Sequence, residues 1–444
     1  MHIAFLTLFL GLASGRVPVE LAVTGPAPGS PAAPEITAIE LILDGAPAGR
    51  LLGPPFRGEI ELGRDLLPHH LEARGLDARS AEVARAEQWL NLPQPPAEVD
   101  LTPETRADGR IAAVRLAFRS VLHQPPGRVT ATLDGVTLPV TGAMVTLPPY
   151  RPDLPHLLSI EGRYSRGPAA RRDLAFGGSL AGEVSTELTA VPIRTHGALP
   201  PVADIRRWFQ AGSQTLAPQA VEEGPGEILL VRDANVSPAA VEVGRRWTPS
   251  GEVSRLQREL SLATGDRVRL VDSTATRFAG EEGNSALFDV SHELDSARAG
   301  LYWRLAQTFL SEATGPPRLA DAVAVAGLQA LAANHRRAVL LALSGDADDR
   351  SRYDPATVRR YLAAIRVPLY VWSLRPPPYP PAVAAWGEVE DASTLPRMRR
   401  AHDRLSHDLA AQRIVWLDGR HLPQSIALSP TVARGVELVA GPEH

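Results

Sequence analysis

The chain has 444 residues, of which 44% are hydrophobic and 22% charged, with a formal net charge of −4 at pH 7. One hydrophobic core does not organise this length, so roughly two to four domains are expected, and the small net charge gives no electrostatic reason to expect nucleic acid or an anionic membrane as a partner. The sequence has no cysteine and no lysine, which excludes disulfides, thiolate and Schiff-base chemistry, and a phosphate-binding loop with its lysine.

The amino-terminal residues have the pattern of an export signal. Residues 3–12 form an apolar stretch, and small residues that suit a signal peptidase follow. The sequence therefore predicts a signal peptide over residues 1–15 and a periplasmic or secreted protein, with a buried first strand as the alternative. Proline- and glycine-rich sequence then predicts a linker over residues 16–34. No later segment reaches the roughly 18 uninterrupted apolar residues of a membrane helix, so no integral membrane segment is expected after the signal peptide.

The next part of the chain repeats a pattern of strand and turn residues. Leu43-Asp44-Gly45, Pro54-Pro55-Phe56 and His70-Leu71-Glu72 recur in the same order as Leu133-Asp134-Gly135, Pro148-Pro149-Tyr150 and His156-Leu157-Leu158. Short strands separated by turn residues, without a helical period, predict tandem β-sandwiches. We assign the first sandwich to residues 35–92 and a second β-rich module to residues 93–196. The Asp-Gly pairs are expected to be turn residues, because both types tolerate positive φ.

The first copy resembles bacterial immunoglobulin-like modules. The resemblance rests on the strand that ends in Asp44-Gly45, on the proline-aromatic start of the next strand, and on the segment His69-His70-Leu71-Glu72-Ala73-Arg74. It implies tandem immunoglobulin-like β-sandwiches; the second copy is looser, and a β-rich spacer is the alternative for it.

After a connector over residues 197–226, apolar runs alternate with helical patterns. This alternation is typical of βαβ units and predicts a doubly wound, Rossmann-like α/β domain over residues 227–444. The expected strands are 228–232, 268–272, 338–343, 368–374 and 413–417. The expected helices are 253–262, 301–309, 319–333, 354–364 and 397–411.

The most informative feature is the junction at the first of these strands, which runs into Asp233-Ala234-Asn235-Val236-Ser237. Open α/β sheets place their ligand sites at the carboxyl ends of their strands. The loop resembles the Asp-x-Ser-x-Ser loop of von Willebrand factor type A domains, and the resemblance covers residues 227–444. It implies a metal-ion-dependent adhesion site for Mg²⁺ or Mn²⁺, with Asp233, Asn235 and Ser237 from the first loop and Asp346 from the third.

Two loops depart from the family pattern. In the second loop Pro317 stands where the family has a threonine, and Thr314 is the nearby residue with a side-chain oxygen. In the third loop Gly345 stands where the family has aspartate, and Asp346 follows one position later. A small divalent cation requires a near-octahedral set of oxygen ligands. We therefore expect a degenerate site that is retained as a scaffold, with the acidic residues after Gly345 in a solvated loop.

The sequence contains none of the motifs for a nucleophile elbow, a zinc helix or a phosphate loop. We expect no enzyme but a protein–protein interaction, adhesion or scaffold protein, whose partner is another protein. One alternative is a Mg²⁺- or Mn²⁺-dependent receptor that uses Asp233, Asn235, Ser237 and Asp346. A second is a serine hydrolase with Ser237 or Ser344 as nucleophile, and a third is a purely structural role.

Overall fold

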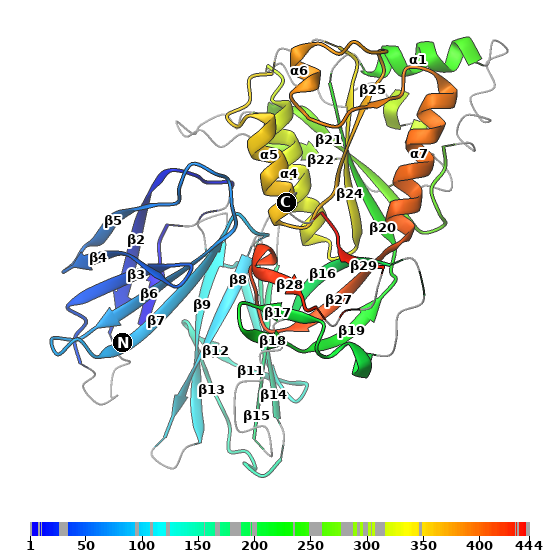
Figure 1. Ribbon diagram of the computed structural model, residues 1–444. Helices are drawn as coiled ribbons and strands as arrows, with labels where there is room; N and C mark the ends of the chain where they lie inside the picture. Colours follow the sequence, from blue (N-terminus) through cyan, green and yellow to red (C-terminus); the bar gives the residue numbers. More distant parts are fainter. Residues whose placement is uncertain are drawn as a thin grey trace. The chain divides into compact units, whose positions relative to one another are not determined.

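The computed structural model describes residues 2–7, 9, 11–25, 34–93, 97–106, 110–120, 125–154, 156–164, 169–177, 188–195, 197, 202–233, 236–247, 260–276, 287–290, 294–295, 301–302, 304–306, 316–345, 349–430, 432 and 435–440. The chain divides into two units (Figure 1). The larger one combines Met1–Pro93 with Leu188–His444, and the smaller one is Gln94–Glu187.

The first β-sandwich belongs to the larger unit and has two antiparallel sheets around one core. The sheet orders are β1-β2-β5 and β4-β3-β6-β7. The strands are β1 (His2–Phe5), β2 (Arg16–Thr24), β3 (Ala38–Leu43), β4 (Ala46–Leu52), β5 (Phe56–Glu61), β6 (His69–Leu76) and β7 (Glu82–Leu90). Buried and half-buried residues alternate along β6, as the two-residue period of a strand with one face on a core requires.

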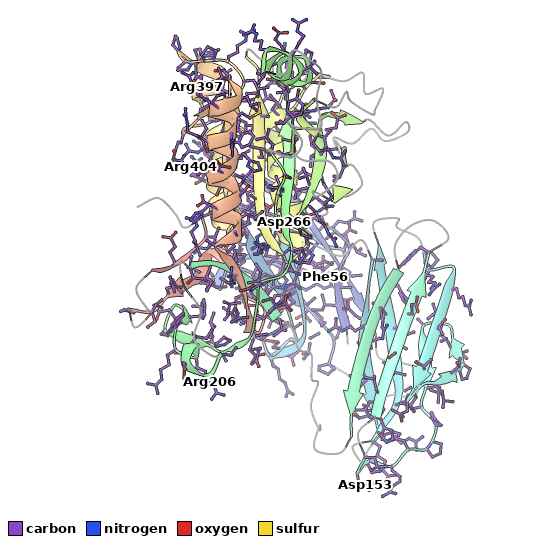
Figure 2. The ribbon with its side chains drawn as sticks, turned by 90° about the vertical axis from the view of Figure 1, so that its right-hand side faces the viewer. Phe56, Asp153, Arg206, Asp266, Arg397 and Arg404 are labelled. Carbon is purple, nitrogen blue, oxygen red and sulfur yellow. The ribbon has the colours of Figure 1, made fainter. Side chains whose placement is uncertain are left out.

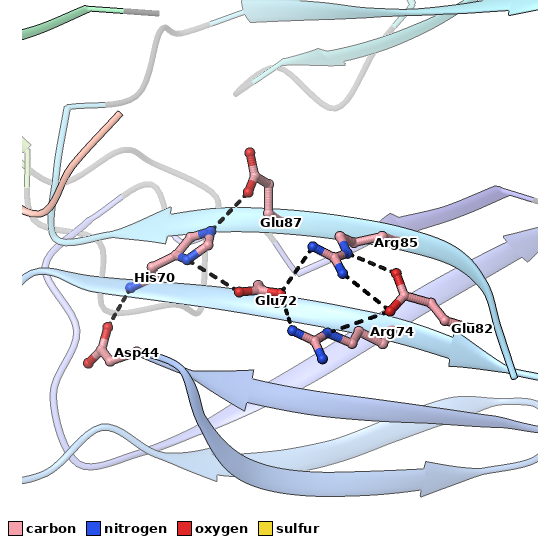
Figure 3. A network of polar contacts seen from close by, with 7 residues as sticks. All are labelled: Asp44, His70, Glu72, Arg74, Glu82, Arg85 and Glu87. Atoms are coloured by element: carbon pink, nitrogen blue, oxygen red, sulfur yellow. Dashed lines mark hydrogen bonds and ion pairs between the residues drawn. The ribbon is translucent and has the colours of Figure 1, made fainter. Parts of the chain in front are cut away.

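Charged side chains on β6 and β7 form a network, shown in Figure 3. Arg74 and Arg85 each pair with both Glu72 and Glu82, at distances between 2.9 and 3.8 Å. Two of these contacts, Arg74–Glu82 and Arg85–Glu72, join the two strands and stabilise their pairing. Because these side chains are partly solvated, each pair contributes about 1 kcal/mol or less.

The second β-sandwich is the smaller unit. Its sheet orders are β11-β10-β14-β15 and β12-β13-β9-β8, and one hydrophobic core joins them. The strands are β8 (Ala97–Thr105), β9 (Ile111–Ser120), β10 (Arg128–Leu133), β11 (Val136–Leu138), β12 (Val140–Thr141), β13 (Met144–Thr146), β14 (His156–Arg163) and β15 (Ala169–Phe176).

The repeat in the sequence corresponds to one polar corner in each sandwich. In the first sandwich Asp44 lies in the turn between β3 and β4 with φ 52°, so the turn prediction for this residue is confirmed. Its carboxylate also contacts two groups of β6. It accepts a hydrogen bond from the backbone N–H of His70 at 2.8 Å and lies 2.7 Å from Nδ1 of His69.

The second sandwich repeats this corner with Asp134, whose φ is 50°. Its carboxylate accepts a hydrogen bond from the backbone N–H of Leu157 at 2.8 Å and lies 2.6 Å from Nδ1 of His156. The structural counterpart of His156 is therefore His69, one residue earlier than the sequence alignment with His70. The register of β6 on β3 matches that of β14 on β10 only in this alignment.

The α/β domain contains a mixed sheet, which has seven strands within the described residues. Five are parallel, in the order β21-β20-β24-β25-β26, and the short β22 and β23 pair antiparallel with β21. The strands are β20 (Gly226–Arg232), β21 (Arg267–Thr276), β22 (Leu287–Val290), β23 (Leu294–Asp295), β24 (Arg336–Leu343), β25 (Leu369–Ser373) and β26 (Glu390–Asp391). Every residue of β20 is buried, as expected of a central strand covered on both faces.

Helices cover both faces of this sheet (Figure 1). α4 (Leu319–Ala332) and α5 (Pro355–Ala364) pack on one face, α1 (Val236–Trp247) and α7 (Leu395–Ala410) on the other, and α6 (Pro381–Ala384) follows β25. Asp354 caps α5 by accepting the Thr357 N–H at 2.9 Å, as Asp-Pro at a helix start predicts. Of the helices that the structure describes, none is long and apolar enough to cross a membrane.

The amino-terminal edge of the parallel sheet is closed by a buried carboxylate. Asp266, labelled in Figure 2, accepts hydrogen bonds from the Gly226 N–H at 2.7 Å and from Nη2 of Arg336 at 3.0 Å. These bonds tie the starts of β20, β21 and β24 together. The opposite, carboxyl-terminal edge is the one that carries the sequence-predicted loops.

A small β module is built from chain segments on both sides of the α/β domain. One sheet has the order β19-β27-β16-β29 and another β18-β17-β28. The elements are β16 (Leu188–Thr195), η1 (Val202–Ile205), β17 (Phe209–Ala211), β18 (Gln214–Leu216), β19 (Pro218–Glu222), β27 (Gln412–Asp418), η2 (Pro423–Ser425), β28 (Ile426–Leu428) and β29 (Val436–Leu438). A separate hydrophobic core holds the module together.

The structure divides the chain differently from the predicted boundaries. Residues 1–34, expected to be a signal peptide and a linker, contain β1 and β2, and Ile3 and Phe5 are 1% and 3% exposed in the sandwich core. This is the arrangement of the alternative prediction, a buried first strand. The expected connector 197–226 contains three strands of the small module. The strand expected at 413–417 lies in β27, which pairs antiparallel with β16 and β19 rather than with the parallel sheet.

Three of the five expected helices correspond to helices in the structure. Those at 319–333, 354–364 and 397–411 correspond to α4, α5 and α7. Of the helix expected at 253–262, residues 253–259 lie outside the described part of the chain. The sequence analysis did not predict α1.

The first sandwich packs on α5 within the larger unit. The buried Tyr361 hydroxyl donates to the Asn91 carbonyl at 2.9 Å, and the Tyr353 hydroxyl donates to the Leu12 carbonyl at 3.0 Å. Trp89 joins the hydrophobic core beneath α4 and α5. The sandwich therefore shares a core with the α/β domain.

Candidate functional site

The first loop begins at the end of β20 and is held by its own aspartate. Asp233 is 2% exposed, and its N–H donates to the Ala342 carbonyl at 3.1 Å. One carboxylate oxygen accepts the Ser344 N–H at 2.6 Å, and the other accepts the Ser344 hydroxyl at 2.7 Å. Asp233 thus ties the first loop to the third, and both of its oxygens bind protein donors.

Ser237, in the first turn of α1, also binds the protein itself. Its hydroxyl donates to the Ala306 carbonyl at 2.7 Å. The serine therefore anchors α1 to the segment that contains Ala306. The other two predicted ligands, Asn235 and Asp346, lie outside the described residues.

The second loop reaches the carboxyl edge through Pro317 and Arg318. The Arg318 N–H donates to the Ser273 carbonyl at 2.7 Å, and the Pro317 carbonyl accepts the Arg350 N–H at 2.8 Å. Pro317 has no side-chain oxygen, and Thr314 lies outside the described residues. Within the described residues, the second loop therefore has no side-chain oxygen at the position where the family has a threonine.

The third loop contains a glycine that no other residue replaces without strain. Gly345 has φ +151°, and a Cβ atom there would lie 2.7 Å from Cζ of Arg375 and 2.9 Å from its Nε and Nη1. Where the family has a carboxylate, this chain therefore has no side chain, and the guanidinium of Arg375 fills the adjoining space.

An acidic residue later in the third loop caps α4. Asp349 accepts the N–H groups of Leu319 at 2.9 Å and Ala320 at 3.2 Å, and the Ser351 hydroxyl at 2.6 Å. The unpaired N–H groups of a helix start favour such a carboxylate. Asp349 is thus part of the structure and not a solvated loop residue, which corrects the sequence-based expectation for this position.

A buried arginine lies beneath the first loop. Arg232, the last residue of β20, is fully buried and donates from Nη1 to the carbonyls of Arg304 and Leu305, both at 2.8 Å. Burial lowers the pKa of Arg232 to about 10, although the charges of Asp272 and Asp233 oppose that effect. The guanidinium remains protonated at neutral pH, so these carboxylates already have a cation close by.

The described residues do not fit the magnesium site of the family. Asp233 and Ser237 bind protein groups, Pro317 lacks the oxygen of a threonine, and Gly345 lacks a carboxylate. Among the residues that the structure describes, no cluster of three or more His, Cys, Asp or Glu side chains is arranged to hold a metal ion. Hydrogen bonds link the first loop to the third and the second loop to the third, so the polar groups of the described residues at this edge bind one another.

A cavity of about 580 Å³ opens beside the third loop. Leu319, Leu343, Val383 and Trp386 form its apolar side, and each is at most 3% exposed. Its polar residues are Asp349, Ser351, Arg352 and Asp354. A cavity of this size, lined by apolar side chains on one side and a few convergent polar groups on the other, is typical of a small-ligand or side-chain pocket.

Sequence reasoning located the loops but missed the residues that define their chemistry. It did not assign a role to Ser344 as the partner of Asp233, to Arg232 beneath the loop, or to Arg375 beside Gly345. One signal was present for Arg232, because a charged residue that ends a fully apolar strand run must be paired when it is buried.

The chain matches no protein-family profile and no curated protein. Similar solved structures include the ArnB paralog VWA2 from Sulfolobus acidocaldarius, at 8% identity and a TM-score of 0.24 over 73% of this chain and 66% of that chain. Another is the central fibronectin-III array of RIM-binding protein, at 11% identity and a TM-score of 0.23 over 45% of this chain and 80% of that chain. A third is proximal thread matrix protein 1 from the mussel byssus, at 11% identity and a TM-score of 0.28 over 49% and 50% of the two chains. At these TM-scores the likeness carries no argument about fold or function.

Proposed function

We propose that the protein is a non-catalytic binding protein, of the adhesion or scaffold kind, whose α/β domain is a von Willebrand factor type A-like domain with a degenerate metal site. In this proposal the two β-sandwiches are immunoglobulin-like modules, and the partner is another protein. The support is the convergence of three loops at the carboxyl edge of a parallel sheet, which is where such sheets bind ligands.

The observation that carries the proposal is the hydrogen bonding of the Asp233 carboxylate. Both carboxylate oxygens accept hydrogen bonds from Ser344, one from the backbone and one from the hydroxyl. A metal-binding role would compete with these bonds, and breaking them inside the protein costs about 1–3 kcal/mol for each donor left without an acceptor. The edge is therefore proposed to bind its partner without a divalent cation.

The same bonds support a non-catalytic role. Within the described part of the chain, the hydrogen-bond partners of the Ser237 and Ser344 hydroxyls are a carbonyl and a carboxylate, and no histidine is among them. A serine nucleophile requires a base that accepts its proton and is oriented for that purpose. Asp233 accepts a hydrogen bond from the Ser344 hydroxyl, but its other oxygen is held by the Ser344 N–H, so the carboxylate links two loops.

Titration with Mg²⁺ and with Mn²⁺ tests the proposal. A ligand at 100 times its Kd stabilises the folded state by about 2.7 kcal/mol, which a thermal melt detects. We expect no binding heat and no rise in Tm at millimolar metal for the wild type, and the same result for Asp233→Asn. Saturable heat together with a higher Tm, both lost in Asp233→Asn, would contradict the proposal and favour the metal-dependent receptor.

We also propose that the protein acts in the periplasm or after secretion, because residues 3–12 have the apolar character of a signal peptide and small residues follow them. Cleavage after Gly15 would remove β1, whose Ile3 and Phe5 lie in the core of the first sandwich. Amino-terminal sequencing of the protein from cell fractions reports both its location and whether β1 is retained.

A further inference from the structure

Two arginines at the carboxyl edge have guanidinium groups that are exposed and unpaired. Arg352 lines the 580 Å³ cavity together with Gly345, and Arg375 lies against Gly345. Within the described residues neither guanidinium makes a hydrogen bond or an ion pair, and that of Arg352 lies 5.3 Å from the ring centroid of Tyr353. Arg352 thus shares the cavity lining with Gly345, and Arg375 lies directly beside this glycine.

The acidic residues of the cavity do not neutralise these cations. The Asp349 carboxylate binds Leu319, Ala320 and Ser351, as described for α4. The carboxylate of Asp354 accepts the N–H and the hydroxyl of Thr357. Each acid therefore compensates the positive end of the helix that it caps.

The apolar side of the cavity favours an occupant with a hydrophobic side chain. Trp386 and Val383 approach from α6 and the residues that follow it, and Leu319 from the start of α4. Guanidinium groups bind carboxylates in charge-assisted, often bidentate pairs. A carboxylate next to an apolar residue in an extended segment matches both the charge and the lining.

We propose that this edge binds an acidic peptide segment of a partner protein. The carboxylate pairs directly with Arg352 and Arg375, and a neighbouring apolar side chain enters the cavity. The inference rests on the proposed function and deepens it by naming the chemistry of the partner. It assigns the positive charge of the site to the chain's own arginines instead of a metal ion.

Binding of the full-length protein to an array of seven-residue peptides tests this inference. Each peptide has Asp or Glu at its centre beside an apolar residue, and a matched peptide has Asn or Gln in its place. The array is probed in EDTA and in Mg²⁺ with the wild type, Arg352→Gln, Arg375→Gln and the double variant. Arg206→Gln, which removes another exposed arginine, from the small β module, is the matched control, and the Tm of each variant checks its fold.

We expect the wild type and Arg206→Gln to select acidic peptides equally in EDTA and in Mg²⁺. Each single variant should weaken binding of the selected peptides roughly tenfold, the effect of losing one charge-assisted pair, and the double variant should weaken it further. Peptides bound equally by the wild type and the double variant, or bound without preference for an acid, would overturn the inference and leave the proposed function standing. Selection of acidic peptides only in Mg²⁺, unchanged by the arginine variants, would overturn both.

Discussion

The two β-sandwiches share one corner but hold its histidine differently. In both, a turn aspartate binds a backbone N–H and the Nδ1 of a histidine. Nε2 of His69 is buried without a partner among the described residues, whereas Nε2 of His156 lies 2.9 Å from the Arg151 carbonyl. Within the described residues, a proton on Nε2 of the corner histidine therefore has an acceptor, the Arg151 carbonyl, only in the second sandwich.

This difference changes the electrostatics of the corner. The hydrogen bond from His156 to the Asp134 carboxylate raises the pKa of His156 and lowers the pKa of Asp134. Burial opposes the effect at Asp44, but the hydrogen bonds from His69 and the His70 N–H still lower the pKa of its carboxyl. A repeated sequence element thus places a histidine Nδ1 against an aspartate in both modules, and adds a carbonyl partner for Nε2 in the second one.

The largest expected effect separates the two modules by their cores. Leu71 and Leu158 occupy equivalent positions two residues after the corner histidine, and both are fully buried. Replacing either with alanine should cost about 2–5 kcal/mol, through lost burial and the cavity that remains. In calorimetry, Leu158→Ala should lower only the transition of the smaller unit and Leu71→Ala only that of the larger one. Equal shifts of one common transition would show that the units unfold together.

A smaller effect tests the corner itself. Asp44→Asn and Asp134→Asn keep an acceptor for the backbone N–H but remove the charge. The two carboxylate side chains are 37% and 46% exposed, so solvent screens their charges, and each substitution should cost about 1 kcal/mol or less at pH 6. Urea unfolding at that pH measures the two costs. Full stability of Asp134→Asn would mean that the ion pair contributes nothing.

The smallest effect is the dependence on pH in the second sandwich. The contribution of His156 is complete below its unfolded pKa of 6.5 and is lost as pH rises through the raised folded value. That of Asp134 is present above 3.8 and is lost as pH falls through the lowered folded value. The smaller unit should therefore lose a few tenths of a kcal/mol between about pH 6 and 9. Urea midpoints across this range should show the loss in the wild type and not in His156→Asn; an equal loss in both would contradict the assignment.

Local chemistry allowed much of the fold to be predicted. The apolar run of β24, the Asp354-Pro355 helix start and the turn at Asp44 each depend on residues close in sequence, where propensity and capping decide the outcome. The position of the candidate site followed in the same way, because Asp233 comes directly after a buried strand at the carboxyl edge of the sheet.

What the sequence did not reveal depends on contacts between distant segments. Asp233 and Ser344 are 111 positions apart, and whether an aspartate binds a metal or a serine depends on which loop lies beside it. Arg375 belonged to a proline-rich segment with no visible link to Gly345. β27 reads as one more strand of the parallel sheet, and only its pairing with β16 places it elsewhere.

The pairing of β16 with β27 also has a mechanical consequence. The α/β domain begins and ends beside this ladder, which joins seven pairs of residues from Leu188↔Asp418 to Arg194↔Gln412. If tension is applied to the chain on either side of the small module, the force acts on the paired ends Leu188 and Asp418, so this antiparallel ladder opens pair by pair. The 217 residues between Arg194 and Gln412 carry no load while the ladder is intact. A partner bound at the carboxyl-terminal edge of the parallel sheet would then be held by a domain that the pulling force does not stretch until the ladder breaks.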